Sequence, residues 1–170
     1  LLNRTIGMIN KYFKGQVPEY AGQINQVDKE LEETVESKIK EYEDNMENLH
    51  FANAIESIWS IIAKTNKYID ETAPWVLAKE EKTEELKSVM THLVENLRII
   101  AILITPAMKD TANKIFEQLG INDEKCKEYN SIYNYGKTIS NIKVIEKGEP
   151  IFLRLEAEEE IEYIKQQMKG

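Results

Sequence analysis

The chain has 170 residues, which suits one domain with at most a small appendage. Its net charge of −8 argues against a general binder of nucleic-acid backbones, and its one cysteine, Cys126, excludes an internal disulfide framework and fits a reducing cytoplasm. The longest strongly apolar run, 99–105, is far shorter than the roughly 20 residues that span a bilayer, so no membrane association is expected.

Apolar residues at helical spacing predict five helices. Short connections between them predict an all-α fold, an antiparallel helix bundle. In chain order the predicted helices cover about 1–13, 27–49, 51–72, 86–103 and 106–119.

Several residues have specific expected roles within these helices. Gly7 interrupts the first helix, which suggests close approach of a neighbouring helix. Trp59 lies among isoleucines and is assigned to the core, while the acidic residues of 27–49 are expected to form a solvated face. Thr105-Pro106 has the pattern of an N-cap followed by a first-turn proline, and Gly120 that of a left-handed C-cap.

The last part of the chain is less regular. Between 122 and 148 the residues Tyr129, Tyr133 and Tyr135 are expected to fix this segment to the bundle. An extended peptide, 151–155, should follow Pro150, and 157–169 should form a final helix. We therefore divide the chain into a bundle, 1–145, and a C-terminal peptide and helix, 146–170, that folds back on it.

No active site is visible in the sequence. Glycines are too sparse for a phosphate-binding loop, and His50 and His92 have no partners at metal-ligand spacing. A lone thiol such as Cys126 is most often a packing residue. The sequence therefore predicts no catalytic residue and no metal site.

The most informative segment is the end of the third helix, where Pro74 is followed by Trp75. A proline disfavours helical geometry in the residue before it, so the chain must turn there. A tryptophan on such a turn can pack in the core or offer its ring to a flat ligand such as an unpaired base.

The segments 1–13, 66–75, 105–106, 116–120 and 150–155 together resemble the anticodon-binding domain of methionyl-tRNA synthetases. The first helix (LLNRTIGMINKYF) and the 66–75 segment (NKYIDETAPW) are the most distinctive parts of this resemblance. That family reads the CAU anticodon of methionine tRNAs.

The resemblance implies roles for individual residues. Trp75 would stack on or beside the first anticodon base, a cytosine, with Pro74 holding it in place, and Arg4 would contact the same loop. Asn66 would brace the turn and is a further candidate RNA contact. The family also uses an asparagine one turn before the arginine, which would fall just before Leu1.

Spacing alone suggests a local positive patch around these residues. Arg4 should face away from the apolar stripe of the first helix, on the same side as Lys11. Lys64 and Lys67 flank the end of the third helix, and Lys79 follows Trp75. These four lysines are candidate phosphate contacts.

The resemblance also implies a larger parent enzyme. Because the chain starts at Leu1, within a predicted helix, we expect it to be part of a longer methionine–tRNA ligase, inactive by itself and with no cofactor of its own. ATP, and zinc in some members, would belong to the catalytic domain. The expected partners are methionine tRNA and that catalytic domain, with no DNA or membrane partner, in the cytoplasm.

Two alternatives remain open at this point. One is the equivalent bundle of a sister class I synthetase, which would prefer another anticodon. The other is a helical protein-interaction module without RNA binding that docks through its acidic second helix or its C-terminal tail, and a buried Trp75 would favour it.

Overall fold

The computed structural model describes residues 1–139, 141–152 and 156–168, and these form an all-helical protein without a β-strand. The helices are α1 (Leu2–Phe13), α2 (Gln26–Glu47), α3 (Phe51–Thr72), α4 (Pro74–Lys79), α5 (Thr83–Ile104), α6 (Lys109–Leu119) and α7 (Ala157–Gln167), with two 3₁₀ helices, η1 (Glu124–Lys127) and η2 (Tyr129–Tyr133). The predicted bundle is confirmed, and α4 is one short helix more than expected.

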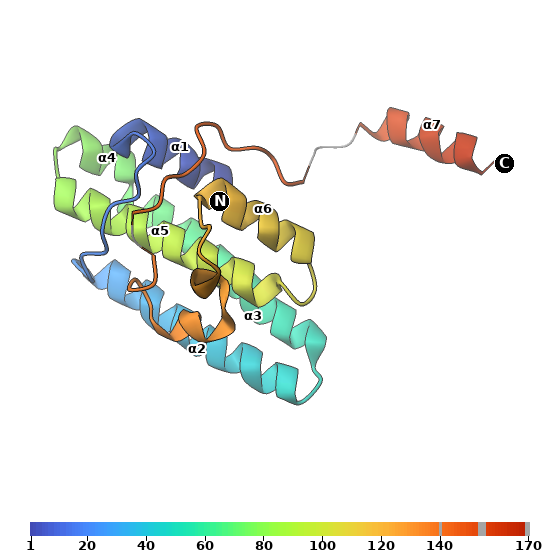
Figure 1. Cartoon of the computed structure of the whole chain (residues 1–170), viewed down its shortest axis with the longest axis horizontal. Coiled ribbons are helices and arrows are strands. Elements are labelled where there is room, and N and C mark those ends of the chain that lie inside the picture. The colour runs from blue at the N-terminus through green and yellow to red at the C-terminus, as the bar shows by residue number, and fades with distance from the viewer. Residues whose placement is uncertain (140, 153–155, 169–170) are drawn as a thin grey trace.

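Helix α5 is the centre of the bundle. It runs between the α2–α3 hairpin and α6 (Figure 1), and every residue from Ser88 to Ile104 is buried. Residues of α5 meet α1, α2, α3, α4 and α6. Because α5 is enclosed on all sides, its buried polar side chains need partners within the protein.

Two residues of α2 depart from the predicted solvated acidic face. Asp28 is fully buried, accepts hydrogen bonds from Tyr68 Oη (2.6 Å) and Ser88 Oγ (3.0 Å), and forms a capping box with Asn25. A buried carboxylate needs such donors, and the helix N-terminus provides more of them. The prediction of a wholly solvated face was therefore wrong for this end of α2.

Glu32, one turn further along α2, faces the buried His92. His92 Nε2 lies 2.8 Å from Glu32 Oε1, and Nδ1 lies 2.7 Å from the Ser88 carbonyl oxygen. Burial by itself would raise the pKa of Glu32, but hydrogen bonds from His92, Tyr20 and Gln23 outweigh it, so the pKa is lowered. His92 is thus a structural residue of the core.

The 122–139 segment is held by polar contacts to the helices. Buried Arg98 of α5 donates to the Cys126 carbonyl (2.8 Å) and to Ser131 Oγ (2.6 Å). The hydroxyl of Tyr135 donates to Asn96 Oδ1 (2.7 Å). Tyr129 and Tyr133 both donate to Glu43 of α2, so all three tyrosines attach this segment to the bundle, as predicted.

Helix α6 ends at the predicted left-handed Gly120, with φ 73° and the paired hydrogen bonds of a Schellman motif. A Cβ atom there would lie 2.0 Å from the Lys143 carbonyl oxygen, so only glycine allows the 141–151 segment to cross. That segment continues along α1 and α6, with Val144 buried.

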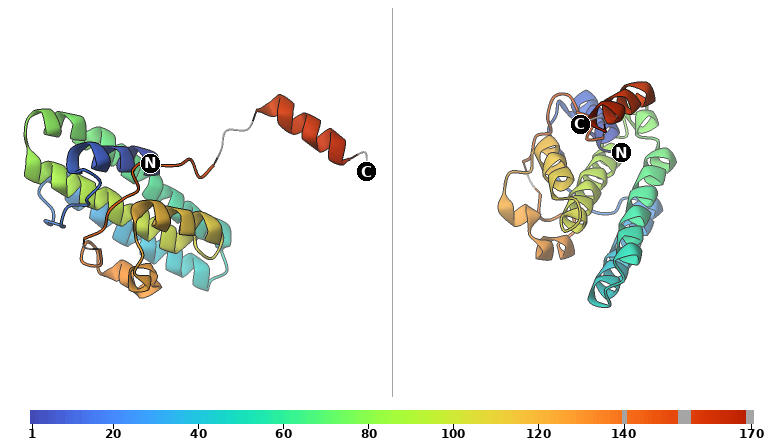
Figure 2. Two further views of the ribbon diagram at one scale, coloured as in Figure 1. Left: turned by 45° about the horizontal axis from the view of Figure 1, so that its top comes forward. Right: turned by 90° about the vertical axis from the view of Figure 1, so that its right-hand side faces the viewer.

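The last described helix, α7, lies apart from the bundle in Figures 1 and 2. Residues 153–155 of the expected extended peptide lie outside the described ranges. The division at 145/146 and the folding back of 146–170 stay predictions.

Two other local predictions were wrong. Thr105 ends α5 and bonds the Ala101 carbonyl (2.7 Å), and α6 begins only at Lys109, because Pro106 lies in the turn between them. Gly7 of α1 is exposed, and a Cβ atom on it would meet no neighbouring segment within 4 Å, so none of the described helices approaches it.

Candidate nucleic-acid interface

Trp75 stands on the first turn of α4. Ala73 takes a left-handed conformation (φ 42°, ψ 62°) that ends α3, and buried Pro74 opens α4 at the position where a proline fits best. Trp75 itself is 48% exposed. The turn therefore separates a buried proline from a neighbouring indole that is open to solvent.

Arg4 is close to this turn. Its Nη2 donates to Asp70 Oδ1 at 3.2 Å, joining α1 to the end of α3. Both side chains are well exposed, so the pair adds little stability but limits the orientations of the guanidinium. Since Asp70 precedes Trp75 by five residues, this ion pair holds the arginine beside the α3–α4 junction.

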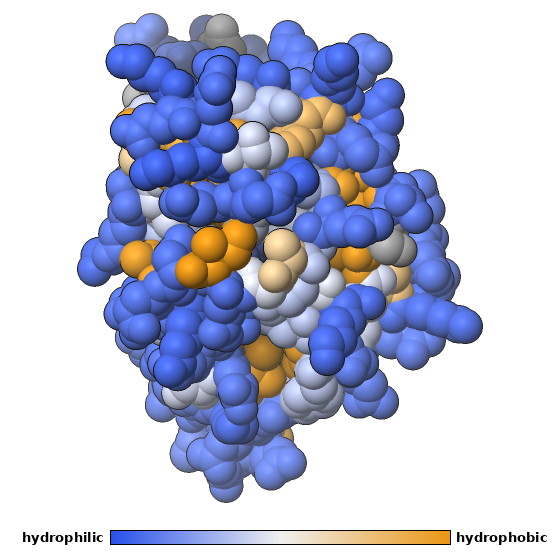
Figure 3. Space-filling model, turned by 90° about the vertical axis from the view of Figure 1, so that its left-hand side faces the viewer, coloured by the Kyte–Doolittle hydropathy of each residue, from blue (hydrophilic) through white to orange (hydrophobic). Residues whose placement is uncertain are grey.

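Helices α1 and α4 lie side by side at one end of the bundle (Figures 1 and 2). Tyr12 and Phe13 of α1 line a shallow hollow together with Leu77 and Ala78 of α4. Figure 3 views the molecule from this end and shows a largely hydrophilic surface with small apolar patches around a central hollow.

The four candidate lysines fall into two groups. Lys67 Nζ lies 3.0 Å from Glu71 Oε1, and the half-buried Lys64 lies 3.9 Å from the same carboxylate and 3.8 Å from Glu30. Within the described residues, Lys11 and Lys79 form no ion pair. The positive charge free for a ligand is therefore that of Lys11 and Lys79.

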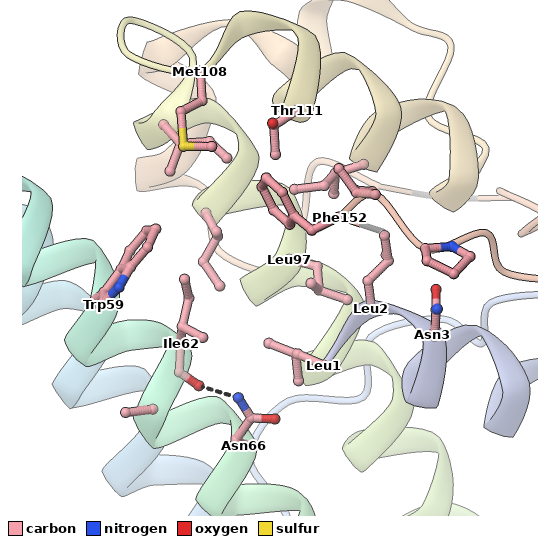
Figure 4. A pocket seen from close by; sticks show the side chains of 16 residues that line it. Leu1, Leu2, Asn3, Trp59, Ile62, Asn66, Leu97, Met108, Thr111 and Phe152 are labelled. Atoms are coloured by element: carbon pink, nitrogen blue, oxygen red, sulfur yellow. Dashed lines mark hydrogen bonds between the residues drawn. The ribbon is translucent and has the colours of Figure 1, made fainter. Parts of the chain in front are cut away.

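Asn66 lies one turn before Asp70 on α3, at the edge of an apolar cavity of about 690 Å³. Its Nδ2 donates to the Ile62 carbonyl at 3.1 Å, and Leu1, Ile62 and Trp59 line the same cavity (Figure 4). The Asn66 amide is therefore bonded within α3, and no hydrogen bond joins it to Trp75 or Arg4 among the described residues.

The assignment of Trp59 to the core was wrong, because the indole is 53% exposed. The buried side of α3 is centred on Ile58, Ile61 and Thr65 instead. Both Ile55 and Trp59 flank that side and border an apolar cavity at the α5–α6 turn, and Trp59 also borders the cavity of about 690 Å³.

Neither metal-binding nor membrane-spanning features occur in the described ranges. Those residues contain no cluster of three or more His, Cys, Asp or Glu side chains that could hold a metal ion. None of the described helices has the length and apolar character needed to cross a bilayer.

The thiol of Cys126 is buried, which raises its pKa.

A sequence profile for the anticodon binding domain of methionyl tRNA ligase matches residues 17–170. The chain belongs to this family. Methionine–tRNA ligases of Listeria monocytogenes serotype 4b and Bacillus subtilis strain 168 are 53% and 54% identical to it over 171 aligned residues, covering all of this chain. The chain spans 26% of the length of each of these relatives.

Solved structures support the same fold for this anticodon-binding domain. The apo form of Mycobacterium tuberculosis methionyl-tRNA synthetase superposes with a TM-score of 0.79 at 24% identity, over 91% of this chain and 31% of that one. A complex of the same protein with methionyl-adenylate gives 0.78 at 24% identity, over 90% and 30%.

Asp70 is the residue of this domain's interface that sequence reasoning left without a role. It stands in the 66–75 segment that carries the resemblance, yet its partner Arg4 is 66 positions away. The sequence does show an acidic residue five positions before Trp75. It does not show which cationic side chain pairs with that residue.

Proposed function

We propose that this domain reads the CAU anticodon of methionine tRNA with Trp75 and Arg4. The observation that supports it most is an exposed indole, set by a proline at the start of α4, together with an arginine that Asp70 holds at the end of α3. Single-stranded RNA is read by stacking its bases on aromatic side chains and bonding their edges.

The two residues have complementary chemistry. The open face of Trp75 stacks the first anticodon base, a cytosine, and such a contact is worth roughly 1–3 kcal/mol. The guanidinium of Arg4 offers planar, directional donors to a base edge or a phosphate. Pro74 fixes the start of α4, and Asn66, whose side chain donates to the Ile62 carbonyl of its own helix, stays a candidate RNA contact.

Lys11 and Lys79 are the proposed phosphate contacts. Trp75 and Lys79 are four residues apart on α4 and so share one face of that helix. Lys64 and Lys67 face Glu71, so we assign them a smaller part of the positive charge offered to RNA.

The whole protein is proposed to be a methionine–tRNA ligase that activates methionine with ATP and transfers it to tRNA in the cytoplasm. This proposal rests on relatives that carry that name and are about four times as long as the chain. ATP, and any zinc, would be bound by the catalytic domain outside these 170 residues, with the anticodon-binding domain as its partner.

The decisive experiment replaces Trp75 with alanine and measures binding of an RNA hairpin whose loop carries CAU. We expect the affinity to fall by roughly 1–3 kcal/mol while the helical circular-dichroism spectrum is kept. Trp75→Phe should recover part of the loss because it keeps a ring to stack on. Trp59→Ala is the matched control, since it removes another half-exposed indole, one that lies in α3 and not on α4.

A panel of hairpins with other anticodons separates the alternatives. Equal loss of affinity in the Trp75 and Trp59 variants would contradict base stacking at Trp75. Tighter binding of a different anticodon would instead favour the bundle of a sister synthetase. The half-exposed indole argues against the protein-interaction module, for which Trp75 was expected to be buried.

A further inference from the structure

Gly7 occupies a position in α1 that nothing in the described chain explains. It is exposed, its φ is not in the left-handed region, and a Cβ atom would meet no neighbouring segment within 4 Å. A glycine inside a helix costs roughly 0.5–1 kcal/mol relative to alanine. Neither packing nor backbone conformation accounts for that cost here.

Gly7 lies on the outer face of α1, opposite the buried Ile6 and Ile9. At about 100° per residue it is about 60° round the helix from Arg4, with Lys11 about 20° from Arg4 on the same side. The outer face of α1 therefore carries a bare stretch of backbone, with one cationic side chain before it and one after it along the helix axis and both turned to the same side.

The other flank of Gly7 is already covered. Asn10 Nδ2 donates to the carbonyls of Ile145 (2.8 Å) and Glu146 (3.1 Å), and Gly148 packs against Asn3. Gly7 therefore lies in an open strip of α1, with the 145–148 segment on one side and Arg4 and Lys11 on the other.

We propose that the ribose–phosphate backbone of the anticodon loop crosses α1 at Gly7, in contact with the helix backbone and between Arg4 and Lys11. The inference rests on the proposed RNA-binding function and deepens it by adding a contact that a side chain would block. Glycine is the usual residue where a backbone must approach a ligand closely. A side chain at this position would hold the loop away from Arg4 and from the indole of Trp75.

The test uses Gly7→Ala and Gly7→Leu, because both new residues favour helix but differ in bulk. The melting temperature should rise in both variants, since no atom of the chain opposes the new side chain. Affinity for the CAU hairpin should fall about tenfold for alanine and further for leucine. Stability and binding would thus change in opposite directions.

Trp75→Ala, measured in parallel, separates this inference from the proposed function. If the Trp75 variant binds more weakly while both Gly7 variants keep full affinity, the crossing point is wrong and anticodon recognition stands. If the Trp75 variant also binds normally, the proposed function fails with it. Equal affinity loss for alanine and leucine would also overturn the steric argument.

Discussion

Arg98 and Glu95 form an ion pair in which neither side chain has any exposed surface. Arg98 Nη2 and Nε donate to the two Glu95 carboxylate oxygens at 2.6 and 2.9 Å, and Nη1 reaches Cys126 and Ser131. The same guanidinium therefore satisfies a buried carboxylate and holds η1 and η2 against α5. At the scale of single residues this is the most sensitive point of the core.

Replacing Arg98 with methionine should lower the free energy of unfolding by about 3–5 kcal/mol, because a buried carboxylate is left without its partner. Urea denaturation followed by circular dichroism measures the loss. Adding Glu95→Leu in the same chain should recover a substantial part of it. A single variant as stable as the parent chain would show that water or another donor satisfies Glu95.

At the scale of elements, the junction of α3 and α4 matters most. One left-handed residue, Ala73, lets α3 end and α4 begin without a linker, so Pro74 is buried while Trp75 faces solvent. The direction of α4 depends on that single backbone conformation. The proposed recognition by Trp75 therefore depends on the backbone of the helix junction as well as on the indole.

Ala73→Val should lower the free energy of unfolding by about 1–2 kcal/mol, since a β-branched residue is poorly tolerated at positive φ. It should also weaken binding of the CAU hairpin by turning α4 away from Arg4. Ala73→Gly is the matched control, because glycine accepts this conformation and should keep affinity. If valine and glycine variants behaved alike in both thermal melts and RNA titrations, the junction would not set the direction of α4.

At the scale of the whole molecule, charge limits how RNA can bind. The chain carries a net charge of −8, and two of the four candidate lysines already face Glu71. The candidate lysines can therefore neutralise few RNA phosphates. In the proposed complex, specificity for the anticodon has to come from contacts to its bases. Off-target RNA should be repelled by the remaining acidic surface.

The affinity for the CAU hairpin should show a shallow dependence on salt. Two or three phosphate contacts correspond to a slope of about −1.4 to −2 in a plot of log K against log salt concentration. Lys11→Ala and Lys79→Ala should each reduce the slope by about 0.7. Lys64→Ala is the control, with little change expected because Glu30 and Glu71 already pair with it.

Much of the bundle could be predicted from periodicity. Helices α1, α2, α3 and α5 begin and end within a few residues of the expected positions, because each has a long amphipathic or apolar pattern. Helix α4 was missed since six residues are too few to show a period. Trp59 was misassigned because an apolar neighbourhood on a wide helical face does not show where its buried side ends.

The sequence by itself determined the fold class, the turn at Pro74 and the candidacy of Trp75 and Arg4, since these follow from local patterns and a family resemblance. Only the tertiary structure decided that Asp70 holds Arg4, that Glu30 of α2 faces Lys64, and that Gly7 lies open. The physical reason is that helical periodicity reports which side of a helix is buried. It does not report which distant side chain will pair with a charge on the exposed side.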